Sequence, residues 1–383
     1  MVSTLRVLHI AETVRGGIAT YLTELHPLQA AEFGARNVVY VVPAHHRADL
    51  RDIPDAAVVT FGGRGRTAQG FAAMAFAGLR EVVRHRPDVV HLHSTFAGAV
   101  LRPLLALMPG RPAVVYCPHG WAFSREVSRP SRALTRLVER LLAGLSDQVV
   151  CISESEHDAA RASRVDAGRL ALVRNGLSAA RGPSRPGRSA EPRAKAGLRV
   201  LFVGRLDRQK GYDLLVAAAA ELAEAVTVRL VGAQVVGREE PGGLPGNVAV
   251  LGWMSRERIE EEYAWADIVV MPSRWEGFGL VALEAMRAGR PVLAFRTGAL
   301  EEIVVDGETG ILCASSDTPG LVAALRRAAT LDLPRMGRRG AHRFREVFAV
   351  ERTHGGLVAA YRTALARRGA RRPAFAVATP QAK

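Results

Sequence analysis

Short apolar runs alternate with longer helical patterns along almost the whole chain. In the first half, nearly continuous runs rich in β-branched residues occur at 5–10, 37–42, 88–93, 113–117, 148–153 and 170–173. A second series follows at 199–204, 226–232, 247–252, 267–273 and 291–295. Such runs are typical of parallel strands that helices cover on both faces. The pattern predicts an α/β protein with two doubly wound, Rossmann-like domains facing each other across a central cleft.

Domain boundaries are expected where the alternation breaks. Residues 1–180 are predicted to form the first domain, and 198–348 the second. We predict a linker at 181–197, because that stretch is rich in Pro, Gly, Ser and Arg and has no periodicity. A C-terminal helix is predicted at 349–366, followed by a disordered tail at 367–383.

The composition is that of a globular protein, with 48% hydrophobic and 23% charged residues among 383. No stretch approaches the roughly 18 to 20 apolar residues of a membrane-spanning helix, and the first residues lack the apolar core of a signal peptide. Cys117, Cys151 and Cys313 lie far apart and form no CxxC pair, so we interpret them as reduced thiols. A cytoplasmic location is expected, with the inner face of the cytoplasmic membrane as a hypothesis.

The net charge of +15 is carried almost entirely by arginine. This balance favours phosphate ligands, polyanions or an anionic membrane surface. One segment, 131–145, has leucines on one helical face and arginines on the other, the arginine series beginning at Arg125. We interpret it as a solvated arginine face with the leucines on the domain core. The alternative is peripheral contact of the basic first domain with acidic lipid head groups.

Arg205 and Lys210 lie in VGRLDRQKG (203–211), a loop that follows a predicted strand and precedes a predicted helix. Ligands of doubly wound sheets bind at the carboxyl ends of strands, so Arg205 and Lys210 are expected in the cleft. A diphosphate leaving group must be neutralised by a metal or by fixed cations. The chain lacks an Asp-x-Asp motif, so two cations on one loop could replace the metal.

Two further loops follow predicted strands of the first domain. Gly16 and Gly17 precede the first helix, where free backbone amides could hold a phosphate, although the pattern is not a dinucleotide-binding GxGxxG. His119 can hydrogen-bond a sugar hydroxyl or face a developing charge. We interpret His91 and His93, on one strand, as pointing to opposite faces, and predict no metal site.

The stretch RWEGFGLVALEAM (274–286) sets Glu276 in a glycine-containing loop and Glu284 two turns into the following helix. A helix N-terminus attracts anions, whereas carboxylates repel them. We therefore expect positively and negatively charged groups to occupy different parts of the site. Amides and cations hold the phosphates, while the carboxylates face sugar and ribose hydroxyls and a developing positive charge.

Taken together, these stretches resemble the family-4 retaining glycosyltransferases of the GT-B fold, over roughly residues 5–365. The resemblance rests on an ordered set of motifs: Gly16-Gly17, His119-Gly120, CISESE (151–156), RNG (174–176), VGRLDRQKG (203–211) and the E-x7-E pattern within 272–294. It implies transfer of a hexose from a nucleoside-diphosphate sugar, UDP- or GDP-linked, with retained configuration and without a metal or other cofactor. It also implies that the C-terminal helix crosses back to the first domain.

Roles follow from the resemblance residue by residue. Arg205 and Lys210 should grip the diphosphate, and Glu284 should accept hydrogen bonds from the ribose. Glu276 should lie beside the donor sugar, with His119 contacting the hydroxyls of that sugar. The remaining expected donor-binding positions are Gly16, Gly17, Phe278, Gly279 and Leu280.

Other functions remain open at this point. A nucleotide-sugar epimerase of related two-domain fold would bind the same donor without an acceptor. An arginine-rich nucleic-acid-binding protein is a non-enzymatic alternative, but no recognition helix stands out, so no nucleic-acid partner is expected. The acceptor is expected to be a saccharide, lipid-linked, in exopolysaccharide or other cell-surface glycan synthesis.

Overall fold

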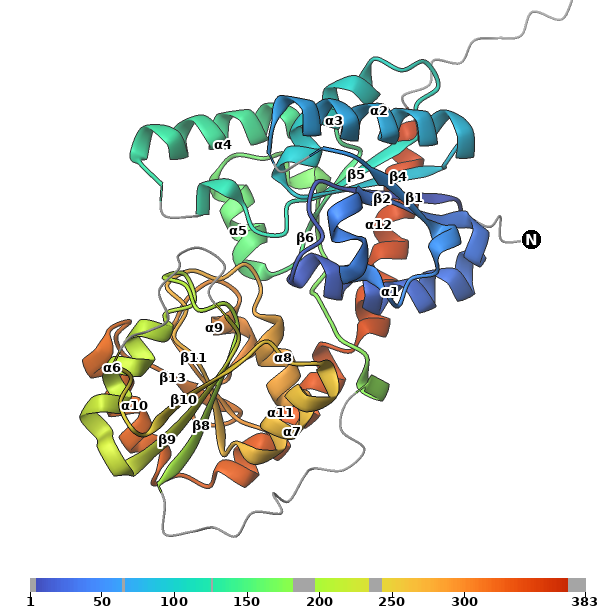
Figure 1. Ribbon diagram of the computed structural model, residues 1–383. Coiled ribbons are helices and arrows are strands. Elements are labelled where there is room, and N and C mark those ends of the chain that lie inside the picture. The colour runs from blue at the N-terminus through green and yellow to red at the C-terminus, as the bar shows by residue number, and fades with distance from the viewer. Residues whose placement is uncertain (1–4, 64–65, 125–126, 182–196, 234–242, 371–383) are drawn as a thin grey trace, which may run out of the picture.

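The computed structural model describes residues 5–63, 66–124, 127–181, 197–233 and 243–370. The chain forms two α/β domains, each a parallel sheet with helices on both faces (Figure 1). Within the described residues the first sheet has the strand order β3-β2-β1-β4-β5-β6-β7, and the second has β10-β9-β8-β11-β12-β13. The predicted doubly wound, two-domain fold is therefore confirmed.

Every strand predicted from the sequence is present. The first sheet comprises β1 (Val7–Ala11), β2 (Val38–Pro43), β3 (Val58–Phe61), β4 (Val89–His93), β5 (Ala113–Cys117), β6 (Gln148–Cys151) and β7 (Leu170–Leu172). The second comprises β8 (Leu198–Val203), β9 (Val226–Val231), β10 (Val248–Gly252), β11 (Ile268–Met271), β12 (Val292–Ala294) and β13 (Gly310–Leu312). The sequence did not predict β3 and β13. The central strands are buried along their length, as their continuous apolar character requires.

Helices connect the strands. In the first domain they are α1 (Gly17–Phe33), α2 (Ala68–His85), α3 (Thr95–Ala106), α4 (Arg129–Ala143) and α5 (Glu154–Ala162). In the second they are α6 (Tyr212–Leu222), α7 (Arg256–Trp265), α8 (Leu280–Arg287), α9 (Leu300–Ile303), α10 (Thr318–Ala328) and α11 (Leu333–Val347), followed by α12 (Val350–Ala370). None of the helices in this part of the chain combines the length and the apolar character needed to cross a bilayer.

Helix α12 returns to the first domain after the second domain is complete (Figure 1). It packs against α1 and against β4, β5 and β6, and its Tyr361 is fully buried there. The helix continues to Ala370, so 367–370 are helical where the sequence predicts the start of a disordered tail. The rest of that tail, 371–383, and residues 182–196 of the linker predicted at 181–197 lie outside the described residues.

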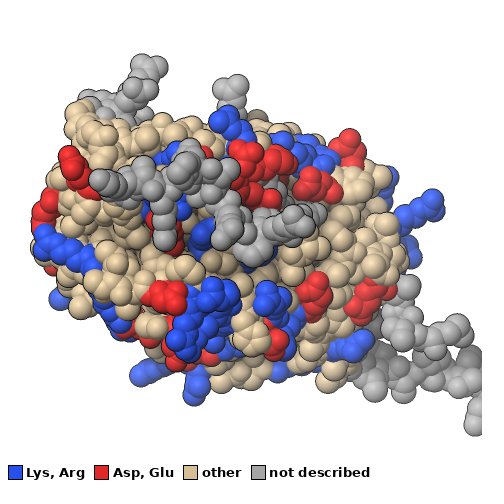
Figure 2. All heavy atoms as spheres, turned by 90° about the horizontal axis from the view of Figure 1, so that it is seen from below, with Lys and Arg blue, Asp and Glu red and all other residues tan. Residues whose placement is uncertain are grey.

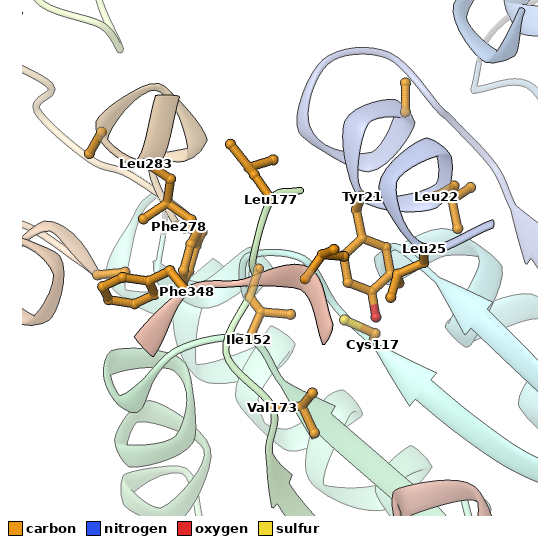
Figure 3. Close-up of a cluster of buried hydrophobic side chains, with 14 of the residues drawn as sticks. Tyr21, Leu22, Leu25, Cys117, Ile152, Val173, Leu177, Phe278, Leu283 and Phe348 are labelled. Atoms are coloured by element: carbon orange, nitrogen blue, oxygen red, sulfur yellow. The ribbon is translucent and has the colours of Figure 1, made fainter. Parts of the chain in front are cut away.

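The two domains share one buried apolar cluster (Figure 3). Phe278 of the second domain contacts Phe348 edge-on, with ring centroids 6.3 Å apart. Leu177, which leads out of the first domain, pairs with the returning segment: its N–H donates to the carbonyl of Phe348 at 3.0 Å, and its carbonyl accepts from Val350 at 3.1 Å. The two chain crossings between the domains are thus hydrogen-bonded to each other.

Helix α4 turns its leucines outward, so the interpretation of 131–145 is wrong. The exposed fractions lie between 40% and 65% for Leu134, Leu137, Val138 and Leu141. Glu139 faces inward instead, because its carboxylate accepts hydrogen bonds from Arg102 at 2.8 Å and from the Tyr116 hydroxyl at 2.9 Å. That buried ion pair fixes the rotation of the helix. Arg125, the first of the arginine series, lies outside the described residues.

Candidate active site

Two helix N-termini, one from each domain, meet at the interface between the domains. A Cβ atom on Gly17, the first residue of α1, would lie 3.6 Å from Cδ1 of Leu280, the first residue of α8. Each helix is preceded by a glycine with positive φ, 64° at Gly16 and 98° at Gly279. The first backbone N–H groups of a helix lack intrahelical partners and carry partial positive charge, so this junction suits an anion. The structure brings these four predicted residues together.

The loop carrying His119 approaches the glutamate loop from the opposite domain. A Cβ atom on Gly277 would lie 3.6 Å from the carbonyl oxygen of His119 and 3.9 Å from Cα of Gly120. His119 itself has φ of 51°, in the left-handed region that non-glycine residues seldom adopt. Backbone strain of this kind concentrates at functional sites, where the surroundings hold it in place. The structure therefore brings the loops that carry His119 and Glu276 together.

Glu276 is held by several contacts at the end of β11. Its Oε2 lies 2.6 Å from Nζ of Lys210 and 3.3 Å from Oγ of Ser273, and Oε1 accepts the N–H of Gly277 at 3.2 Å. The side chains of Lys210 and Glu276 are only 19% and 8% exposed. Gly298 supports the same loop, because a Cβ atom there would lie 2.4 Å from the Glu276 carbonyl oxygen. The two residues predicted to serve opposite ends of the donor thus form an ion pair.

Arg205 lies on the same loop as Lys210 but points to other partners. Its guanidinium lies 2.7 Å from Oε1 of Gln209 and 3.1 Å from Oδ2 of Asp207, and its side chain is 44% exposed. Gln209 also donates to the carbonyl of Trp275 at 3.2 Å, which links this loop to the glutamate loop. Both predicted cations therefore sit beside the glutamate loop, with Arg205 the more accessible.

Glu284 projects from α8 and accepts a hydrogen bond from the Tyr263 hydroxyl at 2.9 Å. Burial, and then the nearby Glu284 carboxylate, raise the pKa of Tyr263 well above its ordinary value, so the phenol remains a donor. Sequence reasoning missed Tyr263, because it belongs to α7 and no motif marks it. Phe278 is placed differently from the other predicted residues: its side chain is buried in the interdomain cluster.

Histidines from neighbouring strands cluster behind His119. His91 and His93 do share one face of β4, with ring centroids 4.1 Å apart, because residues two apart on a strand point the same way. The interpretation that they point to opposite faces is wrong. Together with His9, they place three ring nitrogens within 4.8 Å of one another. Some of these nitrogens are hydrogen-bonded to each other, as His9 Nδ1 is to His93 Nε2 at 2.9 Å. The absence of a metal stays a prediction.

Burial keeps these imidazoles neutral. It lowers the pKa of His119 to about 3 and that of His9 to about 4. The pKa values of His91 and His93 lie well below the ordinary value for the same reason, with neighbouring imidazoles adding to the effect. At neutral pH His119 can therefore both donate and accept one hydrogen bond, but it brings no positive charge to the site.

Two of the quoted motifs support the site rather than line it. In CISESE, the backbone N–H of Glu154 donates to the carboxylate of Glu302 in the second domain at 3.0 Å, and Arg174 of RNG contacts the carboxylates of both glutamates. The Glu156 carboxylate accepts the backbone N–H of Ile152 at 3.0 Å, and burial raises the pKa of this carboxyl to about 7. The backbone carbonyl of Glu156 accepts the indole N–H of Trp121 at 2.9 Å and thereby anchors the loop that carries His119. Sequence reasoning assigned Glu156 no role.

Comparisons with known proteins identify the family. Residues 16–176 match the glycosyl transferase 4-like domain, and residues 197–330 match glycosyl transferases group 1. An uncharacterized 41.2 kDa protein from the cps region of Klebsiella pneumoniae is 30% identical over 327 residues, which cover 83% of this chain and 88% of that protein. The D-inositol 3-phosphate glycosyltransferase of Rhodococcus jostii is 32% identical over 317 residues, covering 75% of this chain and 69% of the relative.

Solved structures agree on the fold. The Anabaena protein HepE in complex with UDP has a TM-score of 0.76 at 20% identity, covering 93% of this chain and 99% of that one. Sucrose-phosphate synthase from Thermosynechococcus elongatus has a TM-score of 0.77 at 22% identity, covering 94% and 99%. With fold, site and relatives in agreement, the chain belongs to the family-4 glycosyltransferases of the GT-B type.

Proposed function

We propose that this glycosyltransferase moves a hexose from a UDP- or GDP-linked sugar to a saccharide acceptor, with retained configuration and without a metal. The observation that carries the proposal is the convergence of Gly17 and Leu280 at two helix N-termini, together with Lys210 and Arg205 on the loop next to the glutamate loop. A diphosphate seated there would meet partial positive charge from both domains and full positive charge from one loop. Nothing in this arrangement requires a divalent cation for charge balance.

The division of charge suits the transition state of sugar transfer. As the bond to the diphosphate breaks, negative charge grows on the phosphate and positive charge on the sugar ring. Lys210 and Arg205 are suited to the first, and the Glu276 carboxylate to the second. His119 would contact sugar hydroxyls from the first domain, and Glu284, oriented by Tyr263, would accept ribose hydroxyls. The backbone at Gly16, Phe278 and Gly279 would shape the place where the diphosphate binds.

Calorimetry with UDP, GDP and ADP, each with and without EDTA, tests the donor site. We expect one base to bind regardless of EDTA. Incubation with the corresponding sugar nucleotides and a membrane extract, followed by NMR, then reports the anomeric configuration of the product. An altered sugar nucleotide formed without any acceptor would instead identify an epimerase. Binding of none of the nucleotides would overturn the proposal.

The nucleic-acid alternative finds less support. Basic and acidic side chains are interspersed on the face shown in Figure 2, which offers no unbroken basic track for a phosphate backbone there. A gel-shift titration across salt concentrations separates the two functions. A nucleic-acid-binding protein would show affinity that falls steeply with salt, whereas the glycosyltransferase should show none beyond weak non-specific binding.

The acceptor is proposed to be lipid-linked, for use in exopolysaccharide or cell-surface glycan synthesis at the inner face of the cytoplasmic membrane. Helix α4 supports this proposal, because it exposes both apolar and basic side chains. The exposed apolar residues are Leu134, Leu137, Val138 and Leu141, and its exposed charged residues are all arginines: Arg129, Arg136 and Arg140. An amphipathic helix of this composition is suited to the interface of an anionic bilayer. A second copy of the same helix would bring like charges together.

Liposome sedimentation tests the membrane contact. Replacing Leu137 and Leu141 with glutamate should release the protein from vesicles containing an anionic phospholipid and leave activity on soluble nucleotide sugars unchanged. Val250→Glu is the matched control, because Val250 is also exposed but lies on β10 in the second domain. Equal sedimentation of both variants would exclude α4 as the contact. A change of sedimentation coefficient without vesicles would indicate self-association instead.

A further inference from the structure

A continuous chain of hydrogen bonds runs from the interior of the first domain to His119. Oε1 of Gln29, on α1, lies 2.9 Å from Nε2 of His9. Nδ1 of His9 lies 2.9 Å from Nε2 of His93. Nδ1 of His93 lies 2.9 Å from Nε2 of His119. Gln29, His9 and His93 are each no more than 1% exposed, so water does not interrupt the chain.

The chain allows only one arrangement of protons. A neutral imidazole has one N–H donor and one acceptor nitrogen, whereas an amide oxygen only accepts. Because Gln29 presents its oxygen, His9 must carry its proton on Nε2 and accept at Nδ1. The same reasoning places the proton of His93 on Nε2, and then that of His119 on Nε2. Nδ1 of His119 is left as an acceptor without a proton.

The structure turns the Gln29 oxygen toward His9, and the Tyr361 hydroxyl accommodates this orientation by accepting from the amide NH2 while donating to His91. The Gln29 NH2 group faces the hydroxyl of Tyr361 on α12, 3.4 Å away, and that hydroxyl lies 2.9 Å from Nδ1 of His91. Turning the amide over would reverse every donor and acceptor in the chain. The low pKa values of His9, His93 and His119, caused by burial, also keep a second proton off the rings near neutral pH.

We propose that Gln29, held by Tyr361, fixes the tautomer of His119 through His9 and His93, so that His119 offers Nδ1 as a hydrogen-bond acceptor. Gln29, His9, His93 and Tyr361 are then positioning residues, and His119 is the residue that touches substrate. The inference rests on the proposed function in one respect: the group that donates to Nδ1 is a hydroxyl of the donor sugar. A sugar that lacks that hydroxyl would lose this contact.

Nitrogen NMR of the histidine rings tests the proposal directly. The full chain, labelled with 15N-histidine, reports the protonated nitrogen of each neutral ring through long-range couplings, and loss of a signal in His119→Asn assigns that residue. We expect the Nε2–H form for His9, His93 and His119. The Nδ1–H form at His119 in the wild-type protein would overturn the proposal.

Two variants break the chain at different points. Gln29→Met removes the acceptor oxygen with little change in volume, and Tyr361→Phe removes only the hydroxyl that orients the amide. Both should give mixed tautomers at His119 and lower kcat on the order of tenfold, because one fixed hydrogen bond in the transition state is worth about that much. The KM for the donor should change little.

The outcomes separate this inference from the proposed function. The tautomer is read in the free protein, so failure to bind any nucleotide would overturn the function while leaving the NMR result intact. A folded Gln29→Met or Tyr361→Phe protein with an unchanged His119 tautomer would overturn the inference while nucleotide binding persists. Stoichiometric Zn²⁺ that shifts the ring nitrogens of His9, His91 and His93 together would also overturn it, because a metal would take the lone pairs that the chain uses.

Discussion

Lys210 and Glu276 form an ion pair across the site, with Nζ 2.6 Å from Oε2. The contact holds each side chain in place against the other. A diphosphate arriving beside Lys210 would share its ammonium group, and the Glu276 carboxylate would then face the sugar. The positive ammonium group and the negative carboxylate are thus already positioned before the donor binds.

The pair should contribute to folding as well as to turnover. Lys210→Met is expected to lower the free energy of unfolding by on the order of 3 kcal/mol, because it leaves a largely buried carboxylate unpaired. The double variant Lys210→Met/Glu276→Gln removes both charges and should regain most of that stability without regaining activity. Chemical denaturation and initial rates measure the two effects. Equal instability of the single and double variants would contradict the coupling.

Arg205 should act on turnover with little effect on stability, because its guanidinium is 44% exposed. Arg205→Ala is expected to lower kcat by about 10² to 10³, the usual loss for one fixed electrostatic donor. Arg326→Ala provides a control, because Arg326 is also paired and exposed but lies on α10. Steady-state kinetics that are near wild type for Arg205→Ala would remove Arg205 from the mechanism.

Glu284 should act on nucleotide binding. Glu284→Ala removes a charged acceptor for the ribose and leaves the Tyr263 hydroxyl without this partner, so the Kd of the nucleoside diphosphate should rise about 10- to 100-fold. Tyr263→Phe should give a smaller rise, because the carboxylate remains. Calorimetry measures both. A larger effect for Tyr263→Phe than for Glu284→Ala would contradict this assignment.

The buried histidines predict acid sensitivity. His9 titrates at 6.5 when unfolded and at about 4 in the native state, so the unfolded state binds more protons between those values. The contribution of neutral His9 to the free energy of unfolding is complete above pH 6.5 and is lost as the pH falls toward 4. It amounts to on the order of 3 kcal/mol in all. His91, His93 and His119 act in the same direction.

Glu156 acts in the opposite direction, because its pKa is raised from 4.5 to about 7. It contributes most below pH 4.5, and that contribution is lost as the pH rises through 7. Burial also lowers the pKa values of His26 and His46 and raises that of Glu302, so six histidines stand against two carboxyl groups. The free energy of unfolding should therefore rise between pH 4.5 and 6.5. Urea denaturation at several pH values checks the slope, and Glu156→Gln should make it steeper. A flat profile would show that these groups remain solvated.

The strands were predictable because buried parallel strands are apolar on both faces. The sequence did not predict β3, whose VVTF residues are only partly buried, or β13, whose GIL sequence offers only two apolar residues after a glycine. Periodicity also showed that 131–145 has two faces, but it could not show which one meets the core. The inward face is set by the Arg102–Glu139 pair, and Arg102 lies on a different helix, far away in sequence.

The loop residues of the site were predictable because each follows a strand of a doubly wound sheet, where ligands bind. The residues that hold them were not. Glu156, Tyr263 and Gln29 act through contacts between separate segments, and their local sequence is that of ordinary helix surfaces. Their roles depend on which neighbours the tertiary fold supplies, and no motif spacing records that.

The course of α12 has a consequence for synthesis of the chain. The helix covers one face of the first sheet and buries Tyr361 against it, yet it is among the last segments to leave the ribosome. Until then, β4, β5 and β6 present an uncovered apolar face while the second domain is still being made. Domains generally fold as they emerge, the N-terminal one first. Here the first domain to begin folding is the last to finish.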